Sequence, residues 1–128
     1  MSTFISAITL VVPDYDAAIA FYVDVLGFEL LEDTDLGGKK RWVKVAPAGG
    51  QTTILLAQAD GDAQSAAIGN QTGGRVSFFL QTDNFGQDYQ YFVANGVHFL
   101  EEPREEPYGI VVVFSDPFGN LWDLIEPK

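Results

Sequence analysis

The sequence predicts an α+β fold of two tandem β-α-β-β-β units, which form a half-open, barrel-like cup with the helices outside. The first observation is a repeat. Residues 14–27 and 83–96 have the same length, an N-terminal Asp, apolar residues at i, i+4, i+7 and i+8, and a closing Gly. The second is that one β-rich run precedes each repeat and three follow it. Because a single helix covers only one face of a sheet, the other faces must meet each other or enclose a cavity.

The first half begins with a run rich in β-forming residues, Ile5–Val12, which we expect to be a strand that ends at Pro13. Asp14 is a good N-cap for the next helix, and Gly27 suits the position after its last turn. One face of this helix carries four apolar residues, Ala18, Tyr22, Val25 and Leu26. Gly-containing turns then separate three expected strands, over residues 28–32, 41–46 and 52–58.

The second half repeats this order after a polar, Gly- and Ala-rich connector at residues 60–73, in which we expect at most a short helical turn. Asp83 is the expected N-cap, and the apolar helix face carries Phe85, Tyr89, Phe92 and Val93. The expected strands are residues 75–81, 97–100, 108–115 and 121–126, and the acidic run 101–106 between two of them is predicted to be a solvated loop. We therefore predict one domain over residues 1–128, with halves at 1–59 and 74–128.

The composition excludes several classes of function. A formal net charge of −11 argues against nucleic acid, whose phosphates need a basic surface. It favours cationic or neutral ligands or serves only solubility, and the scattered positions of the acidic residues favour solubility. No apolar run approaches the roughly 20 residues that span a bilayer, and the first residues lack the features of a signal peptide. We therefore expect a cytoplasmic protein that binds neither nucleic acid nor membrane. The absence of cysteine excludes disulfide bonds and thiolate chemistry.

The stretch that organises the chain is a turn followed by a strand near residue 120. Asp116-Pro117 and Gly119-Asn120 have the residue types of a tight turn, and Leu121–Glu126 alternates like a strand. Asp123 lies in the middle of this apolar strand, where burying a carboxylate is costly unless something pairs with it. Two alternatives follow: Asp123 faces solvent on an edge strand, or it faces inward and meets a partner or ligand there.

Several short runs carry a resemblance to a known family. They are Val12-Pro13-Asp14, Ala20-Phe21-Tyr22, Val25-Leu26-Gly27-Phe28, Tyr108-Gly109, Asp116-Pro117-Phe118-Gly119-Asn120 and Asp123-Leu124-Ile125-Glu126. In these the chain resembles the vicinal oxygen chelate superfamily, which includes glyoxalase I, extradiol dioxygenases and the bleomycin-resistance proteins. The resemblance covers almost the whole chain and is specific for the fold. It says little about the reaction, because this fold supports many chemistries.

The resemblance also implies where a catalytic metal would bind. The four ligand positions of the metal-dependent members correspond to Ala7, Leu55, Ser77 and Asp123. A catalytic divalent site needs about three protein donors, and here only one carboxylate and one hydroxyl are present. The single histidine, His98, lies on a different expected strand. We therefore predict that the protein has no metal and no other cofactor.

The candidate site follows from strand alternation together with the resemblance. If Asp123 faces inward, the ligand-binding residues are expected to be Trp42, Arg75, Ser77, Phe79, Tyr108 and Asp123. Val43 and Val45 would then face the helix. The alternative is a filled core in which Trp42 packs on Phe79 and Arg75 pairs with Asp123.

The leading interpretation is a metal-free protein that binds and sequesters a small aromatic or cationic compound, as the bleomycin-resistance proteins do. One alternative is a metal-independent lyase, isomerase or epimerase with Asp123 as a catalytic general base. Another is a non-catalytic interaction module. We also expect a homodimer, with residues 5–27 at the contact, because closed pairs are the commonest way to cover sheet edges; the competing possibility is a monomer.

Overall fold

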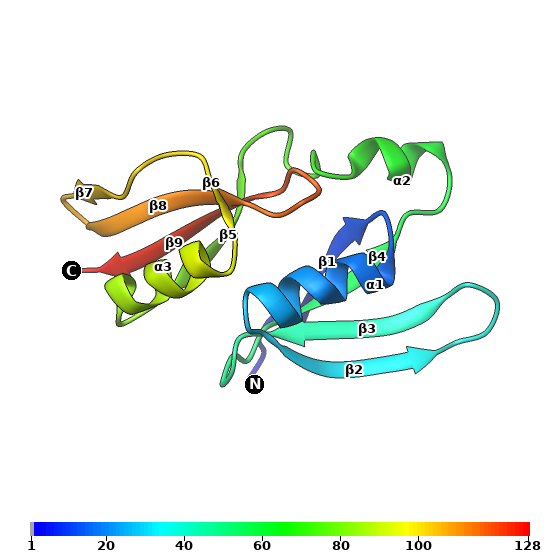
Figure 1. Cartoon of the computed structure of the whole chain (residues 1–128). Helices are drawn as coiled ribbons and strands as arrows, with labels where there is room; N and C mark the ends of the chain where they lie inside the picture. Colours follow the sequence, from blue (N-terminus) through cyan, green and yellow to red (C-terminus); the bar gives the residue numbers. More distant parts are fainter. Residues whose placement is uncertain (1) are drawn as a thin grey trace. The chain divides into compact units, whose positions relative to one another are not determined.

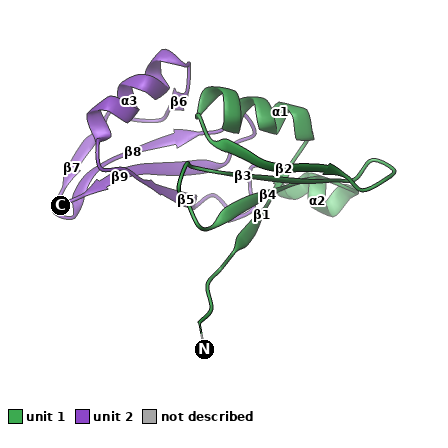
Figure 2. Ribbon diagram, turned by 90° about the horizontal axis from the view of Figure 1, so that it is seen from below, with its two compact units in different colours: residues 1–68 green, residues 69–128 purple. Residues whose placement is uncertain are grey.

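The computed structural model describes residues 2–128, which separate into two compact units, residues 2–68 and 69–128 (Figure 1; Figure 2). The first unit contains a four-stranded sheet in the order β1-β4-β3-β2, in which β1 and β4 are parallel and the other pairs antiparallel. Its elements are β1 (Ala7–Val12), α1 (Tyr15–Ile19), a π-helical segment η1 (Ala20–Val25), β2 (Glu29–Asp35), β3 (Arg41–Ala46), β4 (Thr53–Gln58) and α2 (Asp62–Ala67).

The core of the first unit lies between its sheet and the helix formed by α1 and η1. The residues buried on this face alternate along the strands, as in Leu10 and Val12 on β1 and Ile54 and Leu56 on β4. Val43 and Val45 are also fully buried, which confirms the predicted orientation of β3. The intervening residues of the three strands form a second face that is less deeply buried.

The second unit repeats this architecture with the sheet order β5-β9-β8-β6, and β7 also pairs with β8. Its elements are β5 (Val76–Gln81), α3 (Phe85–Ala94), β6 (His98–Phe99), β7 (Arg104–Glu106), β8 (Gly109–Ser115) and β9 (Leu121–Pro127). Aromatic rings fill its core, where the centre of the Trp122 ring lies 4.5 Å from that of Phe78 and 5.8 Å from that of Phe114. The predicted α+β class, with two β-α-β-β-β units, is thus confirmed.

The two helices are not equal in length, and the prediction of equality was wrong. The N-cap of α3 is Asn84 and not Asp83, because the Asn84 side chain accepts the hydrogen bond from the Gln87 amide. In the first unit Asp14 is the N-cap, as predicted, and accepts from the Ala17 amide at 2.8 Å. Both helices are closed by a glycine with positive φ, Gly27 at 81° and Gly96 at 82°. The first helix therefore has one residue more between its cap and its terminator.

The π-helical segment accommodates this extra residue. In it the Leu26 amide donates to the Phe21 carbonyl, five residues back, at 2.9 Å. The wider turn changes which side chains face the core: Phe21 and Tyr22 are both buried, whereas Val25 is only partly covered. Val93 of α3 is 50% exposed, so the predicted apolar face of that helix is not buried over its whole length.

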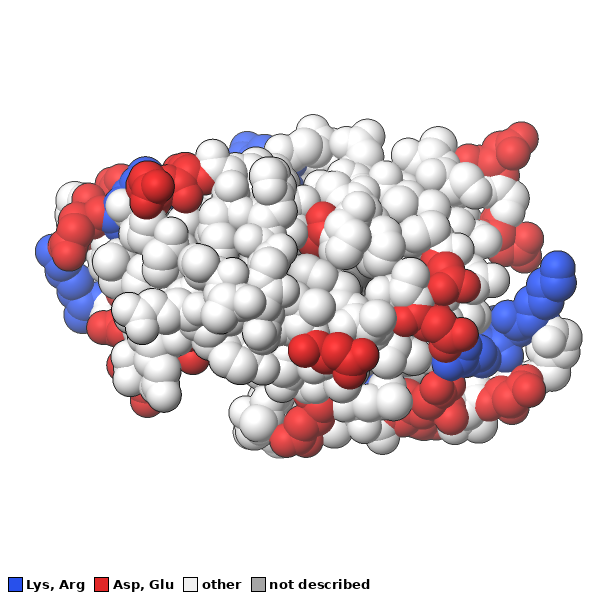
Figure 3. Space-filling model, viewed as in Figure 1, with Lys and Arg blue, Asp and Glu red and all other residues white. Residues whose placement is uncertain are grey.

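Residues 101–106 do not form the expected loop throughout, because β7 pairs with β8 over residues 104–106. Acidic side chains are distributed over the face of the molecule in view, with no single large patch (Figure 3). Within residues 2–128, no helix has the length and apolar character required to cross a membrane.

Candidate functional site

A buried turn between β8 and β9 fixes the position of Asp123. The Asp116 carboxylate accepts hydrogen bonds from the backbone amides of Phe118 at 2.9 Å and Asn120 at 2.8 Å, and from the Asn120 side chain at 2.7 Å. The Asp116 amide also donates to the Asn120 carbonyl at 3.0 Å. The predicted turn chemistry is therefore present, and it starts β9 in a defined register two residues before Asp123.

Asp123 occupies the centre of a sheet, so the edge-strand alternative was wrong. β9 pairs with β5 on one side and with β8 on the other, which places Asp123 between Phe79 and Val113. Its neighbours along the strand, Trp122 and Leu124, are buried in the core. Because side chains alternate along a strand, Asp123 projects from the face opposite to that core.

One oxygen of the Asp123 carboxylate, Oδ1, is buried and has no hydrogen-bond partner among the described residues. Burial of this kind disfavours the charged form and raises the pKa of Asp123 above its usual 3.8. The charge of Arg104 acts in the opposite direction, and that of Glu101 raises the pKa further. Asp123 Oδ1 is therefore a buried acceptor without a hydrogen-bond partner in the described part of the chain.

Arg104 does not neutralise Asp123, because its own bonds go to other carboxylates. Its guanidinium lies 3.0 Å from Glu101 and 2.9 Å from Glu106, and these bonds raise its pKa, with a smaller contribution from Tyr108. Glu101 also accepts from the Val113 amide at 3.0 Å. Sequence reasoning missed Glu101 and Arg104, although an arginine within an acidic run was a visible signal.

The other predicted residues of the second unit lie at or beside the strands around Asp123. Phe79 is 67% exposed and Tyr108 53% exposed, so both present ring surface. The Ser77 hydroxyl lies 3.2 Å from that of Thr72, just before β5. Arg75 is exposed and forms no ion pair with Asp123 in the described part of the chain, so that element of the filled-core alternative was wrong.

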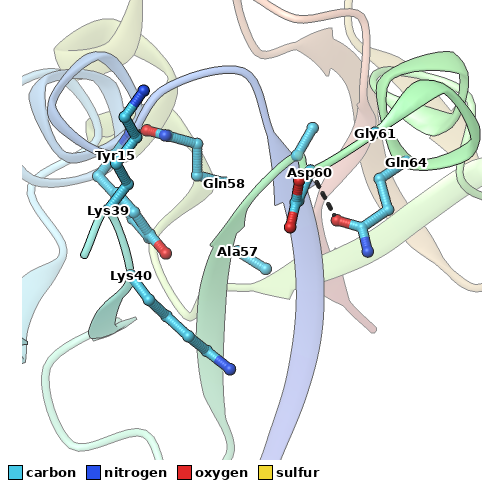
Figure 4. Close-up of a pocket in the computed structure, with 9 residues that line it drawn as sticks. Tyr15, Lys39, Lys40, Ala57, Gln58, Asp60, Gly61 and Gln64 are labelled. Carbon is cyan, nitrogen blue, oxygen red and sulfur yellow. Dashed lines mark hydrogen bonds between the residues drawn. The ribbon is translucent and has the colours of Figure 1, made fainter. Parts of the chain in front are cut away.

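Trp42 lies on β3 of the first unit, where Lys44 Nζ is 5.4 Å from the centre of its ring. Its role in ligand binding stays a prediction. The first unit also contains a pocket of about 640 Å³, and none of the six predicted site residues lines it (Figure 4).

The four positions implied for a metal do not provide a ligand set. Ala7 and Leu55 have no side-chain donors, and no group of three or more His, Cys, Asp or Glu that could hold an ion occurs among residues 2–128. His98 is exposed on β6, opposite Ser115. These residues do not fit a catalytic divalent metal.

Comparison with known proteins agrees with this geometry. The family model for the Glyoxalase/Bleomycin resistance protein/Dioxygenase superfamily matches residues 4–124. An uncharacterized protein of Shewanella frigidimarina (strain NCIMB 400) is 50% identical over 121 residues, which cover 93% of this chain and 90% of that protein. Among solved structures, UcmS2 has a TM-score of 0.84 at 30% identity, with 98% of each chain covered. TnmS3, an antibiotic binding protein from Streptomyces sp. CB03234, has a TM-score of 0.80 at 30% identity, with 99% of this chain and 98% of that chain covered.

Proposed function

Because the chain belongs to the Glyoxalase/Bleomycin resistance protein/Dioxygenase superfamily, we propose that it is a metal-free member that binds a small aromatic or cationic compound. The observation that carries this proposal is the buried, unpartnered Oδ1 atom of Asp123. Buried polar atoms in folded proteins normally have partners, and an exception is explained when a ligand supplies the missing donor. The similarity to TnmS3 supports binding as the activity of this scaffold.

The chemistry around Asp123 favours a ligand that combines a cationic donor with an aromatic or apolar body. A charge-assisted hydrogen bond to the carboxylate contributes about 1.5–3 kcal/mol, and covering the exposed ring of Phe79 about 1–2 kcal/mol. Together these contacts supply roughly half of the 8 kcal/mol that a micromolar Kd requires. Tyr108 adds a ring beside the Arg104 cluster, and the net charge of −11 attracts cations from a distance.

The test is isothermal titration calorimetry against a panel of cationic and aromatic compounds. We expect at least one Kd in the micromolar range, weakened about tenfold or more by Asp123→Asn and by Phe79→Ala. Glu105→Gln is the matched control, because Glu105 is an exposed carboxylate on β7 that forms no ion pair among the described residues. A panel in which nothing binds more tightly than millimolar would refute the proposal and favour an interaction module.

A second candidate is a metal-independent lyase, isomerase or epimerase, favoured by the raised pKa of Asp123. A carboxylate whose pKa is raised is a better general base near neutral pH. Once a ligand is found, NMR in D₂O distinguishes the two functions. Deuterium entering a carbon position of the ligand with the wild type, but not with Asp123→Asn, indicates catalysis; an unchanged ligand indicates binding alone.

We further propose that the protein is a homodimer with the segment at residues 5–27 in the contact. Supporting this, apolar side chains at the start of the chain are exposed, with Phe4 at 69%, Ile5 at 68% and Ile8 at 37%. Light scattering after size-exclusion chromatography is expected to give twice the mass of the 14.0 kDa chain. A single monomeric mass at tens of micromolar protein would contradict this.

A further inference from the structure

The pocket of the first unit lies where α1 begins, β4 ends and the β2–β3 hairpin turns. It is about 640 Å³ in volume, within the range of pockets that hold small metabolites. Tyr15, Gln58 and the two hairpin lysines, Lys39 and Lys40, lie on one side of it (Figure 4). Asp60 and Gln64 face them from the other side, and Ala57 lies between the two sides. Polar groups thus line this space from α1, the β2–β3 hairpin, the end of β4 and α2.

Lys39 and Lys40 are unusual in a chain with only 7 basic residues and 18 acidic ones. Two arginines, Arg41 and Arg104, each form ion pairs with two carboxylates. The two lysines, in contrast, form no ion pair with any residue that the structure describes. The hairpin turn fixes their backbone, because the Leu36 amide donates to the Lys40 carbonyl at 2.9 Å and the Lys40 amide to the Gly37 carbonyl at 3.2 Å. Both lysines therefore line the pocket without an ion-pair partner among the described residues, and their side chains run in opposite directions, with that of Lys40 passing below Ala57 (Figure 4).

The two glutamines add neutral donors to the same space. Gln58 accepts from the Tyr15 amide at 3.2 Å, and Gln64 accepts from the Asp60 amide at 2.8 Å. Because each bond uses the side-chain oxygen, the NH₂ group of each glutamine is left as a hydrogen-bond donor. The Asp60 carboxylate is the one anionic group in the lining, and it can accept from hydroxyl groups.

We propose that this pocket is a second binding site, specific for a small polyhydroxylated anion such as a sugar phosphate or sugar acid. The anionic group lies toward Lys40, and the hydroxyl groups lie toward Asp60 and the glutamine amides. This chemistry differs from that of the site around Asp123, which favours a cation. The two sites are independent, since no residue of one belongs to the other.

The experiment is calorimetric titration of the full chain at low ionic strength with glucose 6-phosphate, gluconate, glucose and inorganic phosphate. We expect glucose 6-phosphate or gluconate to bind at least about tenfold more tightly than glucose, because only the anions use the lysines. Comparing these two anions shows whether the site takes phosphate or carboxylate. Asp123→Asn should leave this binding unchanged, so a failure here is separate from a failure at the other site.

Substitutions that each remove one positive charge test whether the anion binds beside the pocket lysines. Lys40→Gln should raise the Kd of the tighter anion about fivefold to tenfold, and Lys39→Gln, whose side chain runs in the opposite direction, should raise it less. Lys128→Gln, which removes the same charge outside the pocket, should change it less than about twofold at moderate salt. Asp60→Asn should tighten inorganic phosphate while reducing the preference for glucose 6-phosphate over it. Equal losses in Lys40→Gln and Lys128→Gln, or no binding of either sugar anion at 10 mM ligand (about the weakest measurable affinity), would overturn the proposal.

Discussion

Replacing Asp116 by alanine is expected to cost more stability than any other single change in the β8–β9 turn. Asp116 is 3% exposed and its carboxylate accepts three hydrogen bonds, from the amides of Phe118 and Asn120 and from the Asn120 side chain. Truncation leaves these donors without an acceptor where water has little access. Each unsatisfied buried donor costs about 1–3 kcal/mol, so that a total loss of about 3–5 kcal/mol is expected after allowing for non-additivity.

Urea denaturation followed by circular dichroism measures this loss. Asp14→Ala is the matched control, because Asp14 is an exposed N-cap with a single bond to the Ala17 amide and should lose only about 1 kcal/mol. Asp116→Asn keeps one accepting oxygen and should fall between the two. If Asp116→Ala lost no more stability than Asp14→Ala, the turn would not depend on the buried carboxylate, and the account of how Asp123 is positioned would be wrong.

Two further predictions concern Asp123 and the π-helical segment. Since the folded-state pKa of Asp123 is raised above 3.8, ionisation of this carboxyl lowers the free energy of unfolding as the pH rises. Asp123→Asn should therefore be more stable than the wild type at neutral pH, and this difference should vanish below about pH 3. Thermal melts that gave the same difference at every pH would contradict this prediction. Deleting Asp24, an exposed residue of η1, should convert the π turn into an α turn and leave the protein folded. Deleting Gln90 from α3, which has no extra residue, should shift that helix out of register and lower the melting temperature much further. Equal effects of the two deletions would contradict the conclusion that the π turn accommodates one extra residue.

Sequence reasoning located most elements because their signals are local. The Asp14 cap, the closing glycines and the buried valines of β3 each depend on a few neighbouring residues. The π turn escaped notice because a shift of hydrogen bonds from four to five residues back leaves the apolar spacing looking helical. Asp83 and Asn84 are both good caps, and only the backbone distinguishes them.

The parts that were missed depend on contacts between distant residues. β7 has no apolar alternation and is held by its pairing with β8 and by the ion pairs of Arg104. The turn before Asp123 left open whether its strand lies at the centre or the edge of the sheet, because the central position and the unpartnered oxygen depend on β5 and β8 together. The first-unit pocket is lined by the β2–β3 hairpin, the start of α1, the end of β4 and α2, which no local pattern connects.

The order of strands has a consequence for how the chain folds as it is synthesised. β9 follows β5 and β8 in sequence, yet it lies between them in the sheet, just as β4 lies between β1 and β3. In each sheet the strand that is synthesised last joins the first strand to the others, so the sheet stays divided until that strand is available. Such long-range pairing is slow and leaves strand edges open in the meantime. In the second unit the strand that completes the sheet is also the one that bears Asp123, so that the proposed site and the finished sheet arise in the same step.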